Sequence, residues 1–182
     1  MSSLSRLFHH RWAVPVLAAL HRTPGRSANL MHALGVGRDS LRRALDELVD
    51  LRLIARNPGY GHPLRPEYLV LPAGAALLPA CVDLVEALDD LDVTETGLKK
   101  WSMPVVHALG DEPRRFSELR SALPGITARA LTLALKDLVA AGLVQRTVTD
   151  GFPPSTSYRL TPAARPLLAP LTRLGGKDDL GA

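Results

Sequence analysis

The sequence predicts a mainly helical α+β protein in which one folding unit occurs twice in tandem. Its 182 residues leave room for two small domains, and a composition of 46% hydrophobic and 22% charged residues is typical of a folded chain. A segment that begins at Trp12 recurs at Trp101, an offset of 89 positions. In each copy, helical apolar spacing gives way to a short strand pattern, which predicts helices followed by a β-hairpin.

The repeat is carried by residue types that rarely coincide by chance. Residues 12–20 and 101–109 share a tryptophan, a proline, a valine, an alanine and a final leucine. After one inserted residue the offset becomes 90, and this register holds through the later tyrosine and proline positions. We therefore expect a first domain over residues 1–91, a linker at 92–97, a second domain over 98–174 and a flexible tail at 175–182.

Three amphipathic helices are predicted at the start of each copy. The first covers residues 8–20 or 98–109, with a proline near its first turns, where a missing N–H is tolerated. The predicted second helices cover residues 26–34 and 116–123. The third cover residues 39–49 and 127–141, with leucines at i, i+4 and i+7, and Thr127 is suited to cap the later one.

A hairpin and a closing helix complete each copy. Strand patterns begin at Leu53 and Leu143 and return near residues 68–71 and 157–160, after segments rich in glycine and proline. Closing helices are predicted over residues 73–91 and 163–174, each started by a proline. This order is that of a winged helix-turn-helix domain, in which the third helix enters the major groove of DNA and the hairpin, or wing, lies along the backbone.

Short motifs of the second copy follow one another as they do in a known family. They are Lys100-Trp101, Arg114 to Arg120 (RRFSELR), Leu123 to Thr127 (LPGIT), Gly142 to Arg146 (GLVQR) and Tyr158 to Thr161 (YRLT). On these motifs the second copy resembles the HxlR-type winged-helix transcription regulators, and through the repeat the first copy is similar as a degenerate unit. The resemblance implies a bacterial-type regulator. Because family members generally dimerise on two DNA half-sites, it also implies a pseudo-dimer within one chain.

Two features depart from the family pattern. The family often carries a redox-sensing cysteine before its first helix, whereas Cys81 lies late in the first closing helix, so thiol sensing is not transferred. The third helix of the second copy reads Leu131-Thr132-Leu133-Ala134-Leu135, where the family usually presents polar residues. This apolar stretch argues against the recognition of DNA bases by that helix.

The expected DNA contacts come from the third helices and the wings. The third helices supply Arg38, Arg42, Arg43, Thr127, Arg129, Thr132 and Lys136, and the wings supply His62, Arg65, Ser155 and Thr156. Arginine suits guanine or phosphate, whereas the outward Leu133 suits only a thymine methyl group or a protein. In the first copy, outward acids oppose phosphate, so a solvated or partner-facing helix remains an alternative there. Solvated side chains are likewise the alternative for Arg129 and Lys136.

Trp12 and Trp101 occupy equivalent positions in the two first helices. Core packing explains such tryptophans. The alternative is that both line an apolar chamber between the copies, where a flat hydrophobic or aromatic small-molecule effector binds.

Charge and composition narrow the function classes. A net charge of +4 and a pI near 9.6 are compatible with double-stranded DNA as a partner without requiring it. No apolar run predicts a membrane segment or a signal core, so we expect a cytoplasmic protein. One cysteine and scattered histidines predict no disulfide and no metal site, and no catalytic motif predicts an enzyme or a cofactor.

Three functions stay open. The first is a DNA-binding regulator with two winged helices, and the second is a small-molecule-binding or resistance protein that has lost DNA binding. The third is an interaction module that uses its closing helices. Pairing of the two copies predicts a monomer, whereas pairing of closing helices between chains predicts a homodimer.

Overall fold

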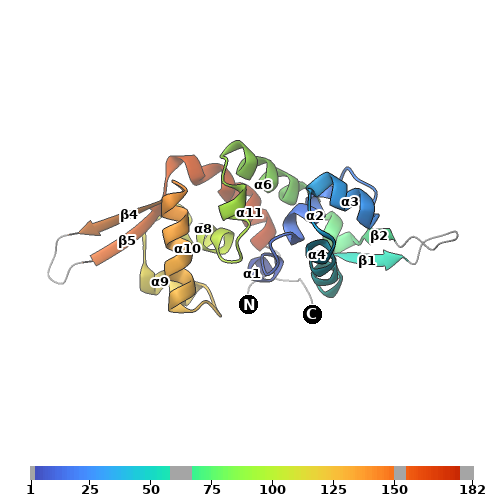
Figure 1. The fold of residues 1–182 in the computed structure, drawn as a ribbon. Helices are drawn as coiled ribbons and strands as arrows, with labels where there is room; N and C mark the ends of the chain where they lie inside the picture. The colour runs from blue at the N-terminus through green and yellow to red at the C-terminus, as the bar shows by residue number, and fades with distance from the viewer. Residues whose placement is uncertain (1–2, 58–66, 150–154, 177–182) are drawn as a thin grey trace.

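The structure is a computed structural model that describes residues 3–57, 67–149 and 155–176, and it has two halves with the same order of elements (Figure 1). The first half contains α1 (Ser3–Leu7), α2 (Ala13–Ala19), α3 (Ser27–Leu34), α4 (Arg38–Asp50), β1 (Ile54–Asn57), β2 (Glu67–Val70), α5 (Pro72–Ala75) and α6 (Leu78–Asp90). The second contains α7 (Thr94–Gly97), α8 (Ser102–Leu109), β3 (Arg114–Arg115), α9 (Phe116–Ala122), α10 (Ala128–Ala140), β4 (Val144–Thr149), β5 (Ser155–Leu160), the 3-10 helix η1 (Pro162–Leu167) and α11 (Leu168–Gly175). The predicted class, mainly helical with small antiparallel hairpins, is confirmed.

The two hairpins pair in equivalent registers. Arg56 lies opposite Tyr68 in the first hairpin, and Arg146 lies opposite Tyr158 in the second. In the second half, β3 adds a third strand in the order β3-β5-β4, whereas in the first half a single bridge, from Arg26 to Glu67, takes its place. The hairpin tips, residues 58–66 and 150–154, lie outside the described residues.

A close backbone approach anchors the first hairpin to the body of its half. The Tyr68 N–H donates to the Gly25 carbonyl oxygen at 2.8 Å. A Cβ atom on Gly25 would lie 2.0 Å from the carbonyl oxygen of Tyr68, so any side chain there would force the two segments apart. The N–H of Leu71 also donates to the Leu53 carbonyl oxygen, as Thr161 does to Leu143.

The third helices form as the leucine spacing predicts. Each of α4 and α10 buries three leucines and one alanine on one stripe and leaves the opposite face in solvent. The Thr127 hydroxyl oxygen accepts a hydrogen bond from the Ala130 N–H at 3.1 Å, which confirms the predicted N-cap.

The predicted first helices are too long at their N-terminal ends. Helix α2 begins at Ala13 and α8 at Ser102, rather than at residues 8 and 98. Pro15 and Pro104 explain the difference, because a proline ring clashes with the carbonyl group four residues earlier. A helix can therefore start only within the turn that precedes each proline.

The predicted closing helices are each broken into two pieces, so these predictions were wrong. The first splits into α5 and α6, and the second into η1 and α11. Pro79 would clash with the Ala75 carbonyl group in a continuous α-helix, and Pro166 would clash with the Pro162 carbonyl group, where the structure has the 3-10 helix η1 instead. Prolines 72 and 162 do start their helices as expected. The predicted linker contains α7, and Gly175 of the predicted tail belongs to α11.

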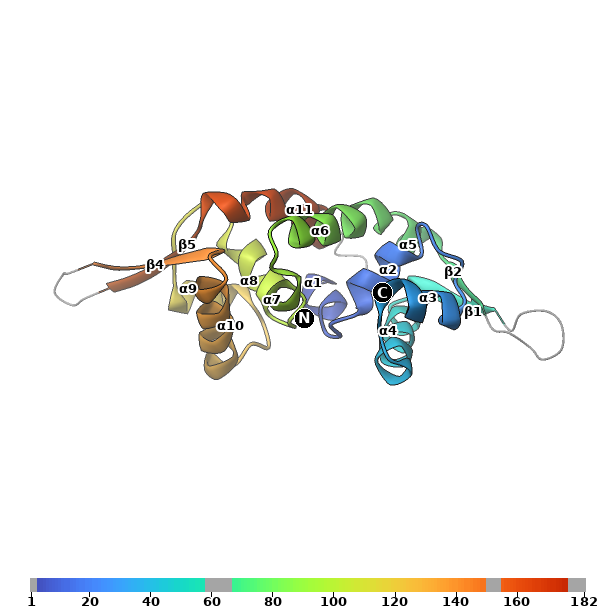
Figure 2. The same cartoon turned by 45° about the horizontal axis from the view of Figure 1, so that its top comes forward.

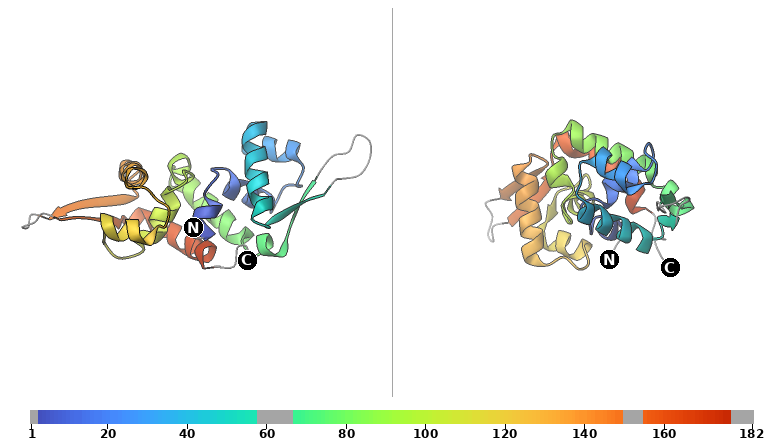
Figure 3. Two further views of the ribbon diagram at one scale, coloured as in Figure 1. Left: turned by 90° about the horizontal axis from the view of Figure 1, so that it is seen from below. Right: turned by 45° about the vertical axis from the view of Figure 1, so that its right-hand side comes forward.

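The halves join through their last helices. Helix α6 packs on α2 of its own half and on α11 of the other half, and α1 also contacts α11. Asp83 of α6 pairs with Arg173 of α11, and these two residues occupy equivalent positions in the repeat. The chain is thus an intramolecular pseudo-dimer, in which the buried side chains of both halves form one continuous hydrophobic core and the hairpins extend from opposite ends (Figure 3).

No helix of the described residues has the length and apolar character needed to span a bilayer.

Candidate nucleic-acid interface

The two third helices project from the same side of the molecule. Figure 2 shows α4 and α10 descending from the body while α6 and α11 run along the opposite side. The hairpins β1–β2 and β4–β5 extend outward beyond them at the two ends. Two such helices on one side of the molecule, flanked by two hairpins, form the arrangement with which winged-helix dimers bind duplex DNA.

Helix α10 presents two unpaired cations on its exposed face. Within the described part of the chain, Arg129 and Lys136 have no hydrogen-bond or ion-pair partner. The hydroxyl group of Thr132 donates to the Ala128 carbonyl oxygen at 2.9 Å, and that of Thr127 caps the helix. Of the four residues predicted here, the two cations have no partner, and Thr127, whose hydroxyl oxygen accepts the capping hydrogen bond, keeps its O–H to donate to a ligand, whereas Thr132 uses its O–H within the helix. Leu133 lies between them and is 51% exposed.

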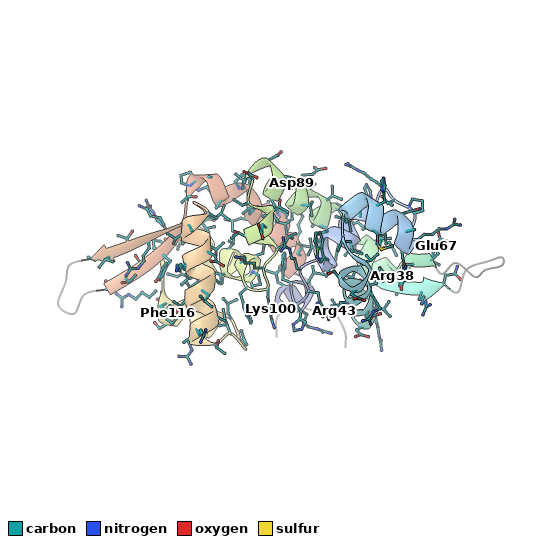
Figure 4. The ribbon with its side chains drawn as sticks, in the orientation of Figure 1. Arg38, Arg43, Glu67, Asp89, Lys100 and Phe116 are labelled. Atoms are coloured by element: carbon teal, nitrogen blue, oxygen red, sulfur yellow. The ribbon has the colours of Figure 1, made fainter. Side chains whose placement is uncertain are left out.

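Helix α4 mixes cations with acids. Arg38 and Arg43 are exposed and have no carboxylate partner among the described residues (Figure 4), but Arg42 pairs with Asp46 at 3.4 Å. Glu47 lies 3.8 Å from the imidazole of His10, equivalent to the Lys99–Asp137 pair at 2.8 Å in the other half. These pairs connect each third helix, α4 or α10, to the segment that precedes α2 or α8 in the same half.

At two equivalent positions the third helices carry opposite charge. Arg129 of α10 corresponds to Asp39 of α4, and Lys136 corresponds to Asp46, at the offset of 90 found in the repeat. The sequence of α10 contains two cations and one acid, whereas that of α4 contains three cations and four acids. Because phosphate contacts dominate the affinity of proteins for DNA, α10 is electrostatically the better suited of the two.

The wing residues are placed only in part. His62 and Arg65 lie outside the described residues. Ser155 and Thr156 are half-buried in β5, opposite Thr149 and Val148 of β4. Each hairpin also exposes an arginine that was not among the expected DNA contacts, Arg56 of β1 and Arg146 of β4, at equivalent positions of the repeat. The sequence alone could not identify such a residue, because alternation along a strand does not tell which of its two faces is exposed until the register of the hairpin is known.

Trp12 and Trp101 are both half-buried and pack against the core. Each ring lies beside a cation, at 5.5 Å from the Arg11 guanidinium and 5.7 Å from the Lys100 ammonium group. Trp101 also lines a surface pocket, but all residues that line this pocket belong to the second half. The pocket therefore does not bring the two tryptophans together.

Cys81 is fully buried in α6, and burial raises the pKa of its thiol from 9.0 to about 12. Burial has this effect because it disfavours the charged thiolate. Only the thiolate attacks oxidants and disulfides. The structure therefore offers no reactive thiol at this position.

We expect Cys81 to react with Ellman's reagent very slowly in the native protein. At pH 8 a pKa near 12 leaves a thiolate fraction of ~10⁻⁴, against ~0.1 for an ordinary cysteine. The rate should rise at least ~100-fold when the chain is unfolded in urea, which serves as the control. Rapid native labelling would show that α6 opens frequently.

Comparison with known proteins identifies relatives of both halves. The model of the HxlR-like helix-turn-helix family matches residues 7–92 and again residues 98–177. An uncharacterised HTH-type transcriptional regulator of Halalkalibacterium halodurans is 41% identical over 41% of this chain and 67% of its own length. One of Synechocystis is 38% identical over 42% of this chain and 58% of its length, so the chain spans about two thirds or less of these relatives.

Two solved structures are also similar to part of the chain. One, described as a possible HxlR family transcriptional factor from Thermoplasma volcanium, is 28% identical, covers 66% of this chain and 90% of its own, and has a TM-score of 0.37. The other is diamide-treated YodB of Bacillus subtilis, which is 29% identical, covers 47% of this chain and 84% of its own, and has a TM-score of 0.40.

Proposed function

Because this chain belongs to the HxlR-like helix-turn-helix family, we propose that it is a transcriptional regulator that binds double-stranded DNA through both of its halves. The observation that carries this proposal is the projection of α4 and α10 from one side of the molecule, opposite the α6–α11 pair. One duplex running beneath the molecule would meet both helices. The regulator names of the relatives support the same function.

The two halves contribute unequally in this proposal. Helix α10 contacts the bases or the phosphates of the duplex with Arg129 and Lys136. Helix α4 meets it with Arg38 and Arg43, which lie toward its N-terminal end, the end that such helices usually insert into the groove. Asp46 and Asp50 lie farther along α4, away from the phosphates. The hairpins follow the DNA backbone on either side.

A salt titration tests DNA binding directly. Fluorescence anisotropy with a labelled duplex of ~30 base pairs should show binding at ~50 mM salt, with an affinity that falls by ~10- to 1,000-fold by ~200 mM salt. This steepness corresponds to the release of counterions from a few phosphates, at a slope of ~0.9 per contact. No binding at ~50 mM salt, where screening is weakest, would rule out the proposal.

We also propose that the chain acts as a monomer. The last helices, which the alternative dimer needs at its surface, are already paired with each other inside one chain, and Asp83 and Arg173 satisfy each other there. Light scattering after size exclusion should give a mass near 19.6 kDa. A mass near twice this value would show that a further surface joins two chains.

A further inference from the structure

A surface pocket of about 210 Å³ lies between the start of α8 and the exposed face of α10. Trp101 and Ser102 line it from the α8 side, and Ala130, Leu133 and Ala134 line it from α10. An apolar protein cavity of ~150 Å³ is enough to hold benzene. The pocket therefore has the size and the lining for a single aromatic ring.

One group in the pocket lining lacks a partner. Ser102 is 1% exposed, and its hydroxyl oxygen has no hydrogen-bond partner within the described residues. Native proteins leave few buried polar groups unsatisfied, and an unsatisfied group calls for an explanation, such as a water molecule or a ligand. A polar atom of a bound ligand would supply one.

The charges around the pocket favour an anion. Lys99 and Asp137 neutralise each other through their ion pair at 2.8 Å. The Lys100 ammonium group, labelled in Figure 4, lies over the indole of Trp101 and has no carboxylate partner among the described residues. The N-terminus of the eight-residue helix α8 adds positive partial charge, because Ser102 is its first residue.

The first half provides a comparison within the same molecule. Its equivalents of Ser102 and Leu133 are Ala13 and Arg43. Neither the unpartnered hydroxyl group nor the exposed leucine is present at those positions. Features that point to a ligand therefore belong to the second half and not to the repeated scaffold.

We propose that this pocket binds a monocyclic aromatic carboxylate, whose ring packs on Trp101 and Leu133 and whose carboxylate is bound by Lys100 and the Ser102 hydroxyl group. Leu133 lies on the exposed face of α10 between Arg129 and Lys136, so a bound anion brings negative charge to the surface that meets DNA. Ligand binding therefore weakens DNA binding. This second step rests on the proposed function, whereas ligand binding itself does not.

Benzoate is the probe, and single-tryptophan variants locate it. In Trp12→Phe, where Trp101 is the remaining tryptophan, benzoate should quench fluorescence saturably, with a Kd of ~0.01–1 mM. In Trp101→Phe the same titration should give no saturable signal. Calorimetry on the unmodified chain measures binding without relying on fluorescence. No saturable binding by either method up to ~10 mM benzoate overturns the proposal, as does equal quenching in both variants.

Ligand analogues and paired variants test the chemistry. Benzyl alcohol and benzylamine should bind at least ~10-fold more weakly than benzoate, since they lack the carboxylate; equal binding would overturn the assignment to an anion.

Ser102→Ala and Lys100→Gln should each weaken benzoate binding at least ~5-fold, whereas their first-half controls Ala13→Ser and Arg11→Gln should not. Ser102→Ala should fold normally because the first half carries alanine there.

DNA binding provides a separate test. With benzoate at ten times its Kd, the unmodified chain should bind DNA at least ~5-fold more weakly, and Ser102→Ala should respond less. If DNA binds equally with and without bound benzoate, the regulatory step is wrong. If no DNA binds even without benzoate, the proposed function fails while the ligand site is still judged by calorimetry.

Discussion

The double variant Arg129→Asp/Lys136→Asp should bind duplex DNA at least ~100-fold more weakly than the unmodified chain. The change converts the two unpaired cations of α10 into the acids that α4 carries at the equivalent positions, Asp39 and Asp46. Loss of one good contact to a base costs ~1–3 kcal/mol, and a lost phosphate contact lowers the salt slope by ~1. Anisotropy at a fixed low salt concentration measures the loss, and a salt titration measures the slope.

The reciprocal variant provides the matched control. Asp39→Arg/Asp46→Lys places the two cations of α10 at the equivalent positions of α4 and also releases Arg42 from its pair with Asp46. It should bind non-specific duplex more tightly and with a steeper salt dependence than the unmodified chain. Both side-chain positions are exposed, so circular dichroism should show the same fold for all variants. Equal DNA affinity in both double variants would exclude these helices from the interface.

Replacing either Leu48 or Leu138 with alanine should lower the free energy of unfolding by about 2–5 kcal/mol, the usual effect of a large-to-small change in a core. These leucines are equivalent in the repeat, and both are fully buried, in α4 and α10. Because the core is continuous through α6 and α11, both changes should shift one common unfolding transition. Urea titrations followed by circular dichroism measure the shift.

The two tryptophans report the halves separately in this experiment. With Trp101→Phe the fluorescence follows Trp12 in the first half, and with Trp12→Phe it follows Trp101 in the second. Coincident transitions in both backgrounds support one cooperative unit. Two transitions, each moved only by the leucine change in its own half, would show that the halves unfold independently.

The elements that local physics specifies were predictable from the sequence. Leucines at helical spacing predicted α4 and α10, and Thr127 predicted the cap of α10, because both signals depend on neighbours along the chain. The repeat gave the matching order of both halves, and the winged-helix order followed from it. The breaks at Pro79 and Pro166 were missed because each closing helix was treated as continuous beyond its first proline.

Features that depend on contacts between distant segments were not predictable. The Asp83–Arg173 pair joins helices 90 positions apart, and no local pattern indicates it. The pocket at Trp101 needs the first turn of α8 to lie against α10, which only the packed structure shows. Burial of Cys81 likewise follows from the packing of α6 and not from its own sequence.

The pairing of α6 with α11 inside one polypeptide has a consequence for what the protein recognises. A regulator assembled from identical subunits presents the same reading surface twice, so its operators are palindromic or nearly so. Here the two reading helices are encoded separately, so each is free to mutate alone, as the opposite charges of Asp39 and Arg129 show. The DNA site that the protein prefers should therefore have two dissimilar half-sites in a fixed relative orientation. Inverting one half-site should weaken binding.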